Sequence, residues 1–137
     1  MIVALVDAGP LIALFDTQDT FHTRFRKMLT QPEIPLRLHT TWPCVTEASH
    51  MLGARERVGL LRWIGAQGAQ IFPFDSEDLP DMSEWMSRYT SERAEMDFAD
   101  ASLYWVAAET GINRIMTLDV RDFSRYRLPD GQAFEIL

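Results

Sequence analysis

The sequence has one cysteine, one lysine and no long apolar run. Cys44 has no second cysteine to pair with, and no group of cysteine and histidine residues has the spacing of a zinc site. The apolar stretches are short and interrupted, so we expect no transmembrane segment, and the stretch MIVALVD is interpreted as a first strand rather than a signal peptide. These absences argue against a disulfide-rich or membrane-spanning protein and predict a cytoplasmic one.

The composition is that of a folded domain. The chain has 137 residues, of which 47% are hydrophobic and 24% are charged, which is enough for one domain with a substantial core. No internal repeat, low-complexity tract or linker divides it. We therefore expect a single domain over residues 1–137.

The charge balance does not identify a partner. The net charge of −7 argues against nonspecific binding to nucleic acid. Lys27 is the only lysine among 13 basic residues, however, and the arginines that make up the rest are the better bidentate ligands for phosphate. Several of these arginines are close in sequence, a pattern that is equally typical of solvated helix faces. They are Arg24 and Arg26, then Arg55, Arg57 and Arg62, and finally Arg121, Arg125 and Arg127.

Apolar runs with strand character alternate with helical patterns along the chain. Strands are predicted at 2–6, 36–40, 69–74, 113–119 and, at an edge, 133–137. Helices are predicted at 10–15, 20–30, from Thr40 or Thr41 through Leu52 with Pro43 in the first turn, at 55–66, from Ser76, and at 97–111 with Gly111 as the stop. This alternation predicts an α/β domain with a mainly parallel sheet of four or five strands and helices on both faces.

Carboxylates stand at the boundaries of four apolar segments. Asp7 directly follows the strand IVALV, and Asp119 directly follows RIMTL. Asp97 and Asp100 are three residues apart, so they share one face of the first turn of an apolar helix. Glu47 lies in the helical segment WPCVTEASHML. Since parallel α/β sheets have their sites beyond the carboxyl ends of the strands, these acids are candidates for one common site.

Each acid also has a purely structural explanation. Asp7, Asp97 and Asp119 could cap helices, and Glu47 could pair with an arginine. Taken together these explanations are weaker, because buried carboxylates repel one another unless a positive charge lies between them. A hard divalent cation, Mg²⁺ or Mn²⁺ rather than zinc, accounts for all of them, since no histidine or cysteine joins the set.

The same segments resemble a known family. LVDAGPLIAL, TTWPCVTEASHML, MDFADASLYWVAAETG and IMTLDVRDF look like the four acidic motifs of PIN-domain ribonucleases, especially the VapC-type toxins of prokaryotic toxin–antitoxin pairs. The motifs extend in order from residue 5 to residue 123. The resemblance implies a three-layer α/β/α fold, RNA as substrate, phosphodiester hydrolysis with Mg²⁺ or Mn²⁺, a homodimer and a small antitoxin partner. It assigns Asp7, Glu47, Asp100 and Asp119 as catalytic and metal-binding acids, with Asp97 and Asp122 as accessory acids.

Physical chemistry suggests how such acids would divide the work. Metal ions held by carboxylates acidify water and neutralise charge on a phosphate in transit. We expect Asp7 and Asp100 to be direct ligands, and Glu47 and Asp119 to hold water or a second ion. Thr117, two residues before Asp119, is a candidate to orient that acid. Separately, the apolar residues in the helices after Thr20 and after Ser76 exceed what a small monomer needs, which also favours a dimer.

Three other classes of protein remain as alternatives. A phosphorelay receiver domain needs a lysine after a late strand, but Lys27 lies in an early helix. A magnesium-dependent phosphatase of the haloacid-dehalogenase type needs that lysine and an acid two residues after Asp7, where this chain has Gly9. A PIN-like module that only binds RNA or a partner would not need four intact acids.

Overall fold

The computed structural model describes all residues 1–137, and its centre is a five-stranded parallel sheet. The strands are β1 (Ile2–Val6), β2 (Leu36–Thr40), β3 (Gln70–Ile71), β4 (Arg114–Met116) and β5 (Glu135–Ile136). The helices are α1 (Ala8–Phe15), α2 (His22–Thr30), α3 (Trp42–Met51), α4 (Ala54–Gly65), α5 (Leu79–Tyr89), α6 (Phe98–Thr110) and α7 (Val120–Arg125), and the 3₁₀ turn η1 (Ser76–Asp78) precedes α5.

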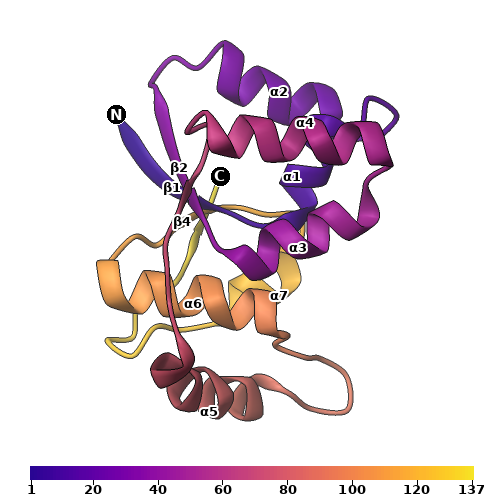
Figure 1. Cartoon of the computed structure of the whole chain (residues 1–137). Coiled ribbons are helices and arrows are strands. Elements are labelled where there is room, and N and C mark those ends of the chain that lie inside the picture. The colour runs from indigo at the N-terminus through magenta and orange to yellow at the C-terminus, as the bar shows by residue number, and fades with distance from the viewer.

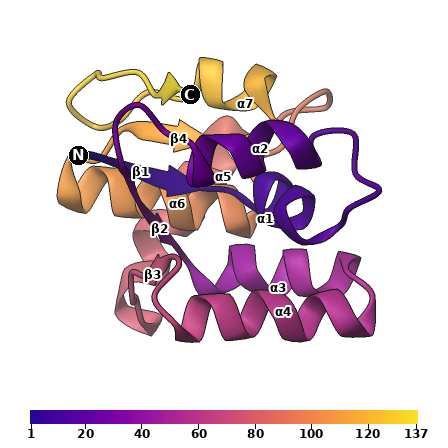
Figure 2. The ribbon, with the colours of Figure 1, turned by 90° about the horizontal axis from the view of Figure 1, so that it is seen from above.

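The molecule has the predicted three-layer α/β/α architecture. The strand order is β3-β2-β1-β4-β5, and every neighbouring pair is parallel. Helices α2 and α4 lie on one side of the sheet, and α5 and α6 lie on the other (Figure 1). Figure 2 shows β4, β1, β2 and β3 side by side in this order. None of the helices combines the length and the apolarity needed to cross a membrane.

Strand β1 is the middle strand and determines where the first acid lies. It pairs with β2 from Ile2 opposite Leu36 to Leu5 opposite His39, and with β4 through Val6 opposite Met116. Because β1 and β4 are parallel neighbours, their carboxyl ends meet at one edge of the sheet. The residues that follow the two strands are therefore brought together, as the sequence predicts for Asp7 and Asp119.

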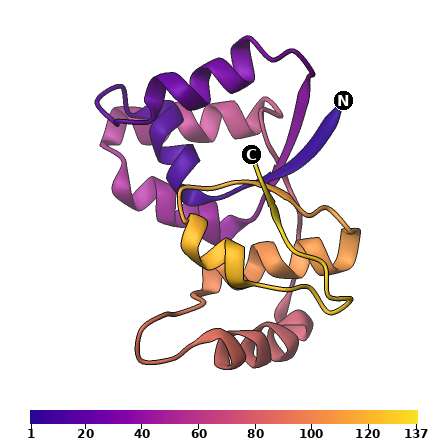
Figure 3. The ribbon, with the colours of Figure 1, turned by 180° about the vertical axis from the view of Figure 1, so that it is seen from behind.

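Helix α6 is the most deeply buried helix of the fold. All its residues from Ala99 to Ala107 are buried, which matches the nearly continuous apolar sequence there. The helix stops at Gly111, whose φ of 78° is in the left-handed region that glycine adopts without strain. Seen from behind, α7 lies beside the amino-terminal end of α6 (Figure 3). This places the third and fourth acidic segments next to each other.

Strands β1 and β2 have the predicted bounds, whereas the other three predicted strands are longer than the observed ones. The segment 69–74 pairs only at β3, since Pro73 has no N–H to donate to a ladder. The segment 113–119 pairs only at β4, because the chain leaves the sheet at Thr117 and turns into α7. The predicted edge strand 133–137 is confirmed at the sheet edge as the short β5.

The six predicted helices are present and differ from prediction mainly in their first turns, whereas α7 has no counterpart among the predicted helices. The predicted helix 10–15 begins at Ala8, because Asp7 accepts a hydrogen bond from the Ala8 N–H and caps it. Thr41 is the N-cap residue of α3, as one of the two predicted alternatives has it. The segment after Ser76 starts as the turn η1, capped by Asp75, and only then becomes α5.

Candidate functional site

A pocket of about 360 Å³ lies at the carboxyl ends of the central strands. All four predicted site acids line it, together with the accessory Asp97. The remaining lining residues are Ala8, Gly9 and Leu118, so no arginine or lysine contributes to the pocket wall. Four separate segments of the chain therefore supply carboxylates to one cavity without a protein cation among them.

Asp7 is buried at the end of β1, with both carboxylate oxygens held. Its Oδ1 accepts a hydrogen bond from the Ala8 N–H at 2.8 Å, and its Oδ2 accepts one from the Thr117 hydroxyl at 2.9 Å. The same hydroxyl oxygen accepts a hydrogen bond from the Asp119 N–H at 2.9 Å. Thr117 therefore orients the Asp7 side chain and also fixes the backbone of Asp119, whereas the sequence suggested a role toward Asp119 alone.

Asp100 lies in the first turn of α6 and is only 6% exposed. Its Oδ2 accepts a hydrogen bond from the Tyr126 hydroxyl at 2.7 Å. Its N–H donates to Oδ1 of Asp97 at 2.8 Å, so Asp97 is the N-cap of the helix. Asp97 thus caps the helix, and its hydrogen bond with the Asp100 N–H holds the backbone of Asp100 at the pocket.

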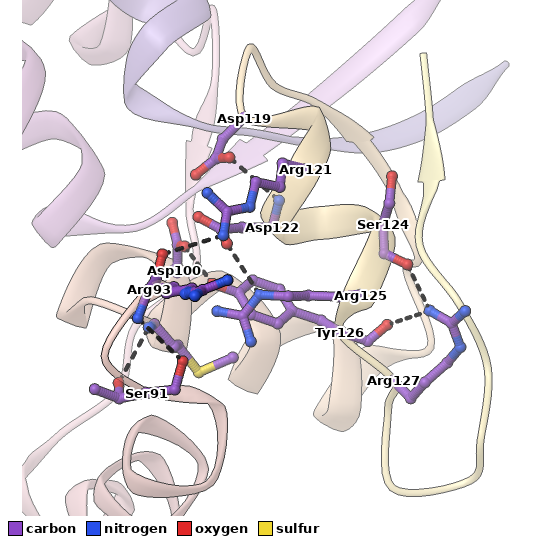
Figure 4. Close-up of polar contacts among 12 residues, drawn as sticks. Ser91, Arg93, Asp100, Asp119, Arg121, Asp122, Ser124, Arg125, Tyr126 and Arg127 are labelled. Carbon is purple, nitrogen blue, oxygen red and sulfur yellow. Dashed lines mark hydrogen bonds and ion pairs between the residues drawn. The ribbon is translucent and has the colours of Figure 1, made fainter.

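Asp119 and Asp122 complete a cluster of acids with Asp100. One carboxylate oxygen from each of these three residues lies within 4.8 Å of the others. Asp122 also accepts a hydrogen bond from Nε of Arg125 at 3.0 Å, and Figure 4 shows these side chains gathered around the end of α7. The sequence ranked Asp122 as accessory, yet in the structure it belongs to the closest group of carboxylates.

Glu47 reaches the pocket from α3 and has an exposed side chain. The ion pairs of the structure do not include it, so the alternative of an arginine partner is not realised. It also lines a second, larger groove of about 790 Å³, whose apolar wall includes Trp42, Phe74 and Phe98. Trp42 and Phe98 are 55% and 43% exposed, which makes this groove the most aromatic surface beside the acids.

The pKa values of the pocket acids are shifted mainly by burial and by one another. Burial and, to a smaller extent, the neighbouring carboxylates raise the pKa of Asp100 to about 8, despite the favourable hydrogen bond from Tyr126. Burial and a hydrogen bond with the Asp122 carboxyl raise the pKa of Asp119 to about 6. Burial, followed by repulsion from nearby acids, also raises the pKa values of Asp7 and Glu47.

Asp122 is the exception among these acids. Burial opposes its ionisation, but hydrogen bonds from the Asp119 carboxyl and from Arg125 outweigh burial, so the pKa of Asp122 is lowered. At neutral pH Asp122 is therefore negative and Asp119 largely so, whereas Asp100 resists ionisation there.

The donor set fits a hard divalent cation. Every nearby ligand atom is a carboxylate oxygen, which is the preference of Mg²⁺ and Mn²⁺. The one sulfur nearby belongs to Cys44, whose Sγ lies 4.0 Å from Oδ1 of Asp7. Burial strongly raises the pKa of this thiol, so it stays protonated and is a poor metal ligand.

The parallel three-layer fold and the pocket lined by acids together define the protein as an α/β domain with an acidic site at the carboxyl ends of its strands. The PIN domain family matches residues 4–128, and the chain belongs to this family. The predicted family is thereby confirmed, and membership supports a nuclease hydrolase in general terms. No curated relative matches the sequence.

A solved structure gives the same fold. The toxin VapC20 of Mycobacterium tuberculosis, described as cleaving the sarcin–ricin loop, superposes with a TM-score of 0.73 and 18% sequence identity. The match covers 88% of this chain and 92% of that one. The likeness confirms the predicted fold.

Tyr126 is the residue of the site that sequence reasoning missed. It lies beyond the four acidic motifs, and its hydroxyl meets Asp100 only because α7 folds back onto α6. A tyrosine beside an arginine carries no motif that would single it out. The tertiary structure alone provides the signal.

Proposed function

We propose that this chain is an endoribonuclease that uses Mg²⁺ or Mn²⁺ to hydrolyse phosphodiester bonds in RNA, with the whole of 1–137 as one nuclease domain. The observation that carries the proposal is the convergence of Asp7, Glu47, Asp100 and Asp119 on one pocket whose wall contains no basic side chain. Membership of the PIN domain family supports the same reaction class.

The residues divide between holding the ion and fixing the reacting groups. Asp7 and Asp100, which are buried and held by Thr117 and Tyr126, would bind the ion directly. Glu47 and Asp119, which are more exposed, would accept a proton from water or hold a second ion. When bound, the ion supplies Lewis-acid stabilisation of phosphate charge and acidifies water.

Arginines outside the pocket wall are suited to the flanking phosphates of RNA. Arg121 is exposed, follows Asp119 by two residues and donates only to the backbone carbonyl of Arg93 at 3.1 Å. Figure 4 shows it beside the acids. Since a bound cation inverts the local sign of the pocket, an anionic substrate is accepted there despite the net negative charge of the chain.

We further propose that the protein is a cytoplasmic toxin with a small cognate antitoxin. This part rests on the fold shared with VapC20, which is itself described as a toxin. The antitoxin would cover the acidic pocket and so prevent access of RNA. The single thiol, Cys44, is buried and free, which suits a reducing compartment.

The proposed homodimer needs a different surface from the one that the sequence suggested. In the helix after Thr20, Phe25 is buried and Met28 packs against the core, and in the helix after Ser76, Met82 is buried. Most of these apolar faces are therefore occupied within the monomer, although Phe21 and Leu79 stay partly exposed at 37% and 38%. The exposed apolar side chains Trp42 and Phe98 lie together on the groove next to the acids, and we place the dimer contact there.

Cleavage of RNA by Asp7→Asn, with and without Mn²⁺, tests the proposed reaction. The wild type should cut single-stranded or loop RNA only with the ion, and the variant should not cut at all. Asp81→Asn, which changes an exposed acid on α5 that does not line the pocket, should cut like the wild type. Equal cleavage by Asp7→Asn and the wild type would remove the acids from catalysis and leave a module that only binds RNA or a partner.

A further inference from the structure

Asp100 depends on one side chain for its orientation. The Tyr126 hydroxyl donates to its Oδ2 at 2.7 Å, and it is the only hydrogen-bond donor to this carboxylate. Tyr126 is fully buried and Asp100 is 6% exposed, so water does not compete freely for the bond. The other oxygen, Oδ1, has no protein donor and is not sealed away from solvent, which leaves it available in the pocket.

The ring of Tyr126 is itself held on several sides. It makes edge-to-face contacts with Tyr89 and Phe123, at ring-centre distances of 5.1 and 5.2 Å. The guanidinium of Arg125 lies 4.9 Å from its ring centre and is fixed in turn by Asp122. Figure 4 shows Tyr126 and Arg125 next to Asp100 and Asp122. The position of the hydroxyl is therefore determined by α5 and α7 rather than by Asp100.

We propose that Tyr126 is a positioning residue that fixes the rotation of the Asp100 carboxylate, so that Oδ1 is presented to a divalent cation in the pocket. Hydrogen bonds to a ligating carboxylate fix its orientation, and loss of such a partner costs about 10- to 100-fold in metal affinity or activity. The inference rests on the proposed metal site. It adds to the four acidic motifs a residue that none of them contains.

The variant Tyr126→Phe isolates the hydroxyl, since it keeps the ring and its packing. Titration with Mn²⁺, followed by isothermal calorimetry, should show affinity weakened by about 10- to 100-fold relative to the wild type. Cleavage of RNA should lose kcat, while the affinity for RNA stays unchanged. In the Asp100→Asn background, Tyr126→Phe should weaken Mn²⁺ binding no further, because both changes remove the same interaction.

Tyr104→Phe is the matched control. The Tyr104 hydroxyl also donates inside the fold, to the carbonyl of Arg127, and Tyr89 donates to the same carbonyl at 3.0 Å. That carbonyl therefore keeps a donor in the control variant, and no acid of the pocket is affected. Mn²⁺ affinity should equal that of the wild type, although a buried tyrosine hydroxyl is lost in both variants.

The outcomes separate this inference from the proposed function. Equal Mn²⁺ affinity of the wild type and a folded Tyr126→Phe would overturn the positioning role, even if RNA is cleaved. If the wild type binds Mn²⁺ but cuts no RNA, the proposed function fails, and the affinities of the two tyrosine variants still decide the inference. A wild type that binds no Mn²⁺ would overturn the inference together with the metal site.

A second measurement applies if Tyr126→Phe does not fold. The chain has three tyrosines, so uniform fluorotyrosine labelling gives three ¹⁹F resonances, which Tyr89→Phe and Tyr104→Phe assign. Mg²⁺ should shift the resonance of residue 126 and leave that of residue 104 in place. An unshifted resonance at residue 126 would overturn the proposal.

Discussion

At the scale of single residues, the metal-free pocket binds protons that the unfolded chain would release. Burial raises the pKa of Asp100 to about 8, and that of Asp119 to about 6, from an ordinary value of 3.8. The folded state therefore binds more protons than the unfolded state above about pH 4. Stability should fall as the pH rises through this window, because ionisation of the folded site costs free energy that the unfolded chain does not spend.

Thermal unfolding of the metal-free protein should show this dependence directly. Between about pH 5 and pH 8 the melting temperature of the wild type should decrease. That of Asp100→Asn should decrease less, because the amide does not ionise. Mn²⁺ should restore stability most strongly near pH 8, since binding requires ionised carboxylates and releases protons. A metal-free melting temperature that rises over this range, or equal slopes for the two proteins, would show that Asp100 is not a proton-binding acid of a cation site.

Some residues of the site can be predicted from the sequence, and others cannot. Asp7 and Asp119 are predictable because each follows a strand, and neighbouring parallel strands end at the same sheet edge. Asp100 is predictable from its place in the first turn of an apolar helix. Tyr126 is not predictable, because its bond to Asp100 depends on the angle at which α7 returns toward α6.

At the scale of the secondary-structure elements, α3 serves both the pocket and the neighbouring groove. Trp42, Thr46 and His50 recur at helical spacing on one face and line the groove, while Glu47 faces both cavities. Phe98, at the start of α6, forms the opposite wall and packs edge-on against Phe74 at a ring-centre distance of 5.8 Å. An exposed aromatic surface that is already ordered in the monomer is typical of an interface.

Trp42→Glu should weaken the proposed dimer, because it places a carboxylate in an apolar contact that already contains acids. Light scattering after gel filtration should show a dimer for the wild type at micromolar concentration and a monomer for this variant. Ile34→Glu changes a residue of similar exposure at 52%, located before β2 and outside the groove, and should remain dimeric. Dimers in all three samples would place the interface elsewhere, and a monomeric wild type would contradict the homodimer itself.

The order and type of the elements follow from the sequence, whereas their ends do not. Five strands and the alternation with helices are predicted by apolar periodicity, and β2 begins and ends at the predicted residues. Strands β3, β4 and β5 are shorter than predicted. Their pairing depends on the neighbouring strand and on turns such as the one after Met116, and apolar periodicity carries no information on either. Apolar periodicity identifies the apolar faces of α2 and α5, but the residues that bury these faces are determined by the tertiary fold.

At the scale of the whole molecule, the net charge of −7 and the acidic pocket oppose an RNA ligand unless a cation intervenes. Several arginines are already engaged in the structure. Arg57 donates to the carbonyls of Ser49 and Leu52, and Arg125 pairs with Asp122. The exposed Arg121 makes one hydrogen bond, to the backbone carbonyl of Arg93, and keeps its other donors for RNA phosphates, so its neutralisation should weaken RNA binding and flatten its salt dependence.

The most direct test of the account is to measure RNA affinity and single-turnover cleavage separately for Asp100→Asn in Mn²⁺. Loss of an acid that acts on the transition state should reduce the cleavage rate by more than about 100-fold, while RNA binds as well as before or more tightly, because one negative charge is gone. Glu47→Gln and Asp119→Asn should behave in the same way, and pairs of these changes should be no worse than single ones. A variant that cuts RNA at the wild-type rate would contradict the account, because the carboxylates would then be helix caps and not the acids of a nuclease.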